Sequence, residues 1–118
     1  MPHATAERHL AHPGLPGARS VAIVLLDELV ALGGSATSKT AQAAVTRRFQ
    51  ELKPEQLEAE LPSGGNAWIN RINWARYLLA SRSLVDSPRT GLWRLTAQGA
   101  EAVKQGTAAD RLRTPRLP

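Results

Sequence analysis

Residues 61–99, LPSGGNAWINRINWARYLLASRSLVDSPRTGLWRLTAQG, decide how this chain folds. Apolar residues recur at helical spacing over 66–82 and predict a helix there. The alternation of residues 92–95, after a turn that contains Pro88 and Gly91, predicts a β-hairpin. Thr96 is suited to cap a helix that follows over 97–105. A helix, a hairpin and a capped helix in this order are typical of the second half of a winged helix.

The predicted helix 66–82 has two different faces. At 100° per residue, the inner face gathers Trp68, Ile72, Ala75 and Leu79. Trp74 lies between the two faces. Asn is a weak helix former, so three Asn residues on one side call for an explanation. Either Asn66 is a cap and the others are neutral surface, or the face is a binding surface that comprises Asn66, Asn70, Asn73 and Tyr77.

The segments before residue 61 supply the other predicted elements. Residues 18–32 are apolar around most of the helix circumference, which predicts a central helix or one shared with a second copy. Gly33 and Gly34 end this helix, and residues 35–37 are expected to pair as a short strand. Residues 38–52 predict a second helix capped by Ser38, and Pro54 suits the first turn of a short helix over 54–61.

The expected fold class is α+β: a winged helix-turn-helix, mostly helical, with a small antiparallel β-hairpin as its wing. The length of 118 residues suits one compact domain, which we place at 18–105. Residues 1–17 contain three Pro and two Gly, and predict a flexible arm. Residues 106–118 carry Arg among Thr and Pro, and predict a basic disordered tail or a linker.

Composition favours an anionic partner and a reducing compartment. The net charge is +5, and the isoelectric point of about 10.7 favours nucleic acid more often than a membrane surface. The chain has no Cys, which excludes disulfides and thiolate metal sites and suits a cytoplasmic protein. The apolar run 21–26 is followed at once by Asp27 and Glu28, so we interpret it as a buried helix rather than a signal peptide.

The sequence contains no recognisable catalytic set, so we do not expect an enzyme. The three histidines, His3, His9 and His12, all lie in the predicted arm, where no further metal ligand accompanies them at suitable spacing. The acidic residues are scattered over helix surfaces, unlike the clustered acids of metal-dependent nucleases. Gly64 and Gly65 indicate a turn more than a phosphate cradle. No metal or cofactor is therefore expected.

The polar helix and the basic residues together predict binding to duplex DNA. Asn can read adenine in the major groove through two hydrogen bonds, and an aromatic ring can contact a thymine methyl or a methylated base. We expect base contacts from Asn66, Asn70, Asn73, Trp74 and Tyr77. For Trp74 the alternative is packing in the core. We expect phosphate contacts from Lys39, Arg47, Arg48, Arg71, Arg76 and Arg89.

These motifs resemble the N-terminal winged-helix domain of Mrr-type restriction proteins. The resemblance covers about residues 18–105 and rests on Pro62-Ser63-Gly64, Asn70-Arg71, Trp74-Ala75, the segment 87–91 and the run Trp93-Arg94-Leu95-Thr96 with Gly99. It implies a winged helix that helps a restriction system recognise DNA, often DNA with modified bases. In the family a nuclease domain with clustered acids and a Gln-x-Lys motif follows a linker, and these residues contain nothing similar.

The predicted function is therefore recognition of a specific, base-modified (methylated) double-stranded DNA target within a restriction system. The candidate partners are that DNA, a nuclease domain or subunit, and a second copy of the chain; a membrane is not expected. Two alternatives stay open. One is a protein-interaction winged helix that dimerises through residues 18–32, and the other is a transcriptional regulator.

Overall fold

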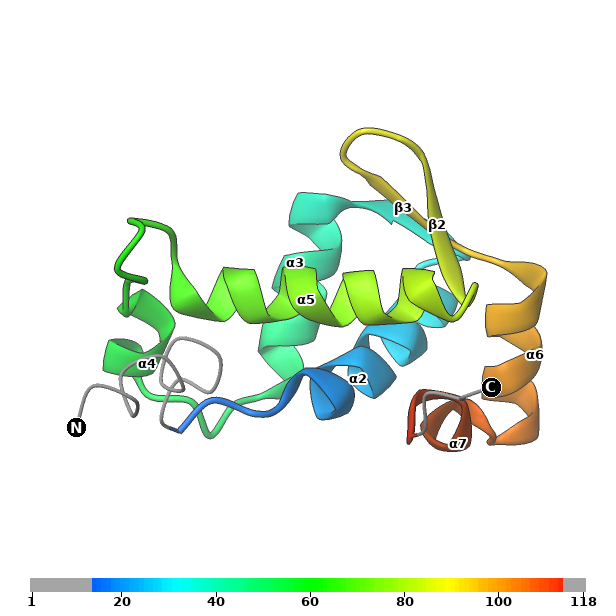
Figure 1. Cartoon of the computed structure of the whole chain (residues 1–118), viewed down its shortest axis with the longest axis horizontal. Helices are drawn as coiled ribbons and strands as arrows, with labels where there is room; N and C mark the ends of the chain where they lie inside the picture. Colours follow the sequence, from blue (N-terminus) through cyan, green and yellow to red (C-terminus); the bar gives the residue numbers. More distant parts are fainter. Residues whose placement is uncertain (1–13, 114–118) are drawn as a thin grey trace.

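The computed structural model describes residues 14–113 and shows an α+β, winged-helix-like fold. Figure 1 shows one long helix lying across the molecule, with a β-hairpin rising from its C-terminal end. The elements in chain order are α2 (Ala18–Ala31), β1 (Ser35–Thr37), α3 (Ser38–Arg48), α4 (Pro54–Glu58), α5 (Ala67–Ser81), β2 (Val85–Arg89), β3 (Leu92–Leu95), α6 (Ala97–Gln105) and α7 (Ala108–Arg113). The expected fold class is confirmed.

The core forms where α2 packs against α5. The predicted inner face of α5 is buried in full, since Trp68, Ile72, Ala75 and Leu79 are at most 2% exposed. Each fully buried large apolar side chain contributes roughly 1.5–3 kcal/mol to folding. On α2 the burial ends before the helix does, because Val30 is 45% exposed and Leu32 is 37% exposed. Leu32 lies at the C-cap of α2, where the chain turns away from the core.

Three short antiparallel strands form the sheet in the order β1-β3-β2. The hairpin predicted from the alternation of residues 92–95 is confirmed, and so is the short first strand at 35–37. Across the hairpin, the Arg94 guanidinium donates two hydrogen bonds of 2.9 Å to the Asp86 carboxylate. These bonds hold the pKa of Asp86 below its ordinary value and raise the pKa of Arg94.

Two predicted helix boundaries need correction. Thr37, not Ser38, caps α3, because its hydroxyl accepts a hydrogen bond of 3.2 Å from the Thr40 amide. α3 ends at Arg48 rather than at residue 52, because Phe49 leaves the helix and packs edge-on against the Trp68 ring. The cap predicted at Thr96 is confirmed, since its hydroxyl accepts from the Gly99 amide at 2.9 Å.

The short helix predicted over 54–61 also ends early. α4 stops at Glu58 because Ala59 adopts an extended conformation, and its carbonyl oxygen accepts a hydrogen bond from the Ala67 amide. This bond ties the segment after α4 to the first turn of α5.

The predicted boundaries of the two chain ends are partly wrong. Residues 108–113, expected in a disordered tail, form α7, whose Leu112 is 1% exposed. Arg82, just after α5, donates from Nε to the carbonyl oxygen of Arg111 at 3.1 Å. At the other end, Leu15 packs against the core, although we expected it in a flexible arm. The three histidines, with the rest of residues 1–13, lie outside the described residues, as do residues 114–118.

Neither a membrane span nor a metal cluster occurs within residues 14–113. None of the helices there combines the length and apolarity that a bilayer crossing requires. The same range holds no group of three or more His, Asp or Glu side chains that could bind a metal ion.

We expect Leu112→Ala to lower the free energy of unfolding by about 2–3 kcal/mol, because it empties a buried site between α7 and the rest of the core. Arg113→Ala is the matched control, since this side chain is exposed and its only described ion pair is with Asp110 within the same short helix. The control should change stability by less than about 0.5 kcal/mol. Urea melts of both variants give the comparison, and equal, negligible effects would show that α7 adds nothing to the fold.

Candidate nucleic-acid interface

The outer face of α5 exposes two aromatic rings beside two carboxamides. Trp74 is 51% exposed and Tyr77 is 58% exposed, and their rings meet edge to face with centroids 5.6 Å apart. Asn70 and Asn73 line a shallow hollow together with these rings. The alternative that Trp74 packs in the core is therefore wrong. A single exposed ring is unremarkable, but an aromatic pair with polar neighbours is suited to contact a ligand.

Asn66 does not belong to this face. Its Oδ1 accepts a hydrogen bond of 2.9 Å from the Ile69 amide, and its Nδ2 donates to the carbonyl oxygen of Leu57 at 2.8 Å. Both polar atoms of the side chain therefore hold the start of α5. The expectation that Asn66 contacts a base is wrong, and the alternative of a helix cap is correct.

Asn73 is held by a residue that the sequence did not single out. The Nε2 of Gln42, on α3, donates to Oδ1 of Asn73 at 3.1 Å. These two residues are 31 positions apart in the sequence. Only the packing of α3 against α5 brings them together, so no local pattern could have revealed the pair.

Arg71 is buried, contrary to the expectation that it contacts phosphates. Its side chain is 8% exposed, and Nη1 donates to the carbonyl oxygen of Pro16. Burial lowers the pKa of its guanidinium. Three residues after Trp68 on the same helix, Arg71 follows the inner face and secures the segment that leads into α2. It is therefore excluded from the interface.

Two further cations that the sequence predicted to bind phosphates already have partners. Arg48 donates to the Glu28 carboxylate at 2.7 Å and lies 4.0 Å from that of Asp27. Because acids of α2 neutralise Arg48, we leave it out of the interface. Arg76 is half-buried, and its Cζ lies 5.8 Å from the centroid of the buried Trp93 ring. This cation–π contact ties α5 to β3, so Arg76 flanks the outer face as a structural link.

The remaining predicted cations, Lys39, Arg47 and Arg89, are exposed. Lys39 and Arg89 come from distant parts of the chain, but the start of α3 lies beside the hairpin turn. The Ser38 amide donates to the carbonyl oxygen of Gly91 at 2.9 Å, and β1 pairs with β3 just before it. Gln42 follows Lys39 by about one turn on α3 and contacts α5. The exposed face of α5, the start of α3 and the hairpin turn are therefore neighbours.

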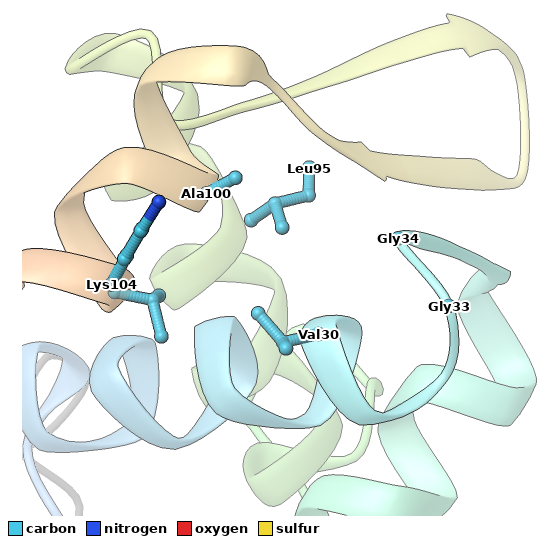
Figure 2. Close-up of a pocket in the computed structure, with 7 residues that line it drawn as sticks. Val30, Gly33, Gly34, Leu95, Ala100 and Lys104 are labelled. Carbon is cyan, nitrogen blue, oxygen red and sulfur yellow. The ribbon is translucent and has the colours of Figure 1, made fainter.

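A second exposed feature is an apolar groove between α2, β3 and α6. Figure 2 shows Val30 of α2 and Leu95 of β3 on its opposite walls, with Lys104 of α6 alongside. Gly33, Gly34, Ala100 and Val103 complete the lining. This groove is the feature on which the dimerisation alternative depends, because Val30 leaves apolar surface open to solvent.

Comparison with known protein families identifies one match. The family described as the Mrr N-terminal domain matches residues 20–105. The chain belongs to this family. No curated protein and no solved structure matches it.

Membership in the Mrr N-terminal domain family confirms the resemblance stated from the motifs, and it associates the chain with restriction systems. The matched residues contain the outer face of α5, the start of α3 and the hairpin. They end with α6, so α7 lies beyond the part of the chain that the family match covers.

Proposed function

We propose that this chain is a double-stranded DNA-binding module of a restriction system that recognises its target without catalysing cleavage. The observation that carries the proposal is the exposed face of α5, formed by Asn70, Asn73, Trp74 and Tyr77, beside cations of α3 and the hairpin. Family membership supports the link to restriction, because Mrr N-terminal domains are associated with such systems.

The shape of α5 suits the major groove of DNA. Its 15 residues span about 22 Å, and a major groove about 12 Å wide admits a single helix. In this arrangement the amides of Asn70 and Asn73 reach base edges. Lys39, Arg47 and Arg89 approach phosphates on either side, where they supply affinity rather than sequence preference.

The aromatic pair gives a physical basis for a preference for methylated bases. A methyl group in the major groove is apolar, and it gains by leaving water to contact an aromatic ring. Trp74 and Tyr77 present such ring surface next to the amides that would read the neighbouring base edge. We include a methylated target in the proposal for this reason, and we assign DNA cleavage to a separate nuclease domain or subunit.

The salt dependence of DNA binding tests the proposal. We expect Lys39→Ala, Arg47→Ala and Arg89→Ala each to reduce the slope of log K against log salt concentration by about one, because each variant loses one phosphate contact. Arg48→Ala is the matched control, since it removes the same charge from the neighbouring position of α3 but its guanidinium already pairs with Glu28. Its slope should stay close to that of the unsubstituted chain.

Fluorescence anisotropy with one labelled duplex at five salt concentrations gives these slopes. Binding without salt dependence, or equal effects of all four substitutions, would contradict the phosphate assignments. The transcriptional regulator alternative shares this chemistry and differs from the proposal only in the target DNA.

The apolar groove beside Val30 favours a second candidate function, a protein-interaction module that forms homodimers. Sedimentation equilibrium separates the two functions. A dimer that Val30→Glu dissociates without loss of DNA binding would assign the groove to self-association, and a monomer at high micromolar concentration would eliminate the homodimer.

A further inference from the structure

Gln42 contacts the centre of the exposed face of α5. Its Nε2 donates to Oδ1 of Asn73 at 3.1 Å. Gln42 itself is half-buried, whereas Asn73 is exposed. A carboxamide at the edge of a binding surface therefore engages one specific atom of a residue that we propose reads DNA.

A second link anchors the backbone of α3 beside this contact. Thr46, one turn after Gln42 on α3, donates its hydroxyl to the Gln42 carbonyl oxygen at 2.7 Å. The same hydroxyl accepts a hydrogen bond of 2.9 Å from Nε1 of Trp68, which is 2% exposed. The turn of α3 that carries Gln42 is therefore anchored to the buried side of α5, and the side chain of Gln42 starts from a fixed position beside Asn73.

The chemistry of the amide group gives this bond a consequence for base recognition. A carboxamide reads adenine through both of its ends, since the oxygen accepts from N6 while the nitrogen donates to N7. In this structure Gln42 engages the oxygen of Asn73, which turns Nδ2 and its two donors outward. Outward donors match guanine, with its N7 and O6 acceptors, and thymine, with its O4 acceptor. They oppose the amino group of cytosine, and at adenine they reach only N7 while the N6 amino group is left without an acceptor.

We propose that Gln42 is a positioning residue that sets the hydrogen-bonding direction of Asn73, so that Asn73 prefers guanine or thymine at the base it contacts. This inference rests on the proposed DNA-binding function and deepens it by naming a determinant of specificity. It also makes α3 a direct contributor to recognition, because the residue that orients Asn73 comes from that helix rather than from α5.

Gln42→Glu tests the inference by reversing the partner's chemistry. A carboxylate only accepts hydrogen bonds, so Asn73 must turn Nδ2 towards it and present Oδ1 to the DNA. Selection from a randomised duplex library should show guanine or thymine preferred at one position by the unsubstituted chain. The Glu variant should shift that position towards adenine or cytosine by about fivefold or more. Gln42→Met donates no hydrogen bond and adds no charge. It should make the four bases nearly equally frequent at that position.

The Asn73→Ala background separates this effect from simple repulsion of DNA by the new charge. Gln42→Glu in that background should weaken binding to all sequences equally, since no amide is left to reorient. The same shift in that background, or an unchanged preference in both Gln42 variants with a native melting curve, would overturn the role of Gln42 and leave DNA binding intact. Failure of the unsubstituted chain to bind any duplex would overturn both proposals.

Discussion

Gly99→Ala should lower the free energy of unfolding by about 3 kcal/mol, one of the largest effects that a single methyl group can have in this chain. A Cβ at Gly99 would overlap the carbonyl oxygen of Leu84, and it would lie 3.0 Å from the carbonyl carbon and 2.9 Å from Cδ1 of Leu95. The carbonyl of Leu84 cannot easily move away, because it accepts a hydrogen bond of 3.1 Å from the Thr96 amide. Gly99 is therefore required where α6 crosses the end of the sheet.

Gly65→Ala provides the matched control for this substitution. Its Cβ would meet only Cδ1 of Leu61, at 3.9 Å, which is an ordinary van der Waals contact. We expect this variant to melt within a few degrees of the unsubstituted chain, while Gly99→Ala melts roughly 10–20 °C lower. Thermal unfolding followed by circular dichroism measures both, and similar melting temperatures would contradict the close packing of α6 on Leu84.

The second large effect distinguishes two tryptophans on the same helix. Trp68→Ala should cost about 3–5 kcal/mol of stability, because Trp68 is 2% exposed, donates to Thr46 and packs against Phe49. Trp74→Ala should cost less than about 1 kcal/mol, since half of the side chain already faces solvent. Because the proposed function places the Trp74 ring against a base, Trp74→Ala should instead weaken the binding free energy for target DNA by more than about 1 kcal/mol.

Urea denaturation and DNA titration of the two Trp variants, with Trp74→Phe as the conservative substitution, carry out this comparison. Trp74→Phe retains an aromatic face and should recover part of the lost affinity. A Trp74→Ala variant that binds every duplex as well as the unsubstituted chain would remove Trp74 from the interface. A strongly destabilised one would show that the contacts of the Trp74 ring within α5 serve the fold rather than the interface.

Local patterns in the sequence predicted the fold because the relevant forces are local. The stripe from Trp68 to Leu79 has helical spacing, and it is buried as the spacing requires. The alternation of residues 92–95 also predicted the hairpin, and the cap at Thr96 predicted the start of α6. The prediction of a disordered tail was wrong at α7. Leu112 alone supplies a large apolar side chain that anchors α7 to the core, and the composition of this segment did not indicate such an anchor.

The candidate site was less predictable, because partners distant in sequence decide which polar groups stay at the surface. Arg71 bonds to Pro16 across 55 positions, and Arg48 bonds to Glu28 across 20. Neither bond leaves a local signal. Asn66 was predictable in part, since an Asn before a helix is a common cap. The assignment of Asn70, Asn73, Trp74 and Tyr77 to base contacts stays a prediction.

Nuclear magnetic resonance of the three tryptophan indole N–H groups during a DNA titration shows whether the outer face of α5 binds duplex DNA. Trp74 is 51% exposed, whereas Trp68 and Trp93 are 2% and 5% exposed. We expect the Trp74 indole signal to shift strongly at stoichiometric duplex, together with the Tyr77 and Arg89 backbone amides, while the Trp68 signal stays in place. A Trp74 signal that does not move while backbone amides beside the groove at Val30 and Val103 shift would contradict this expectation.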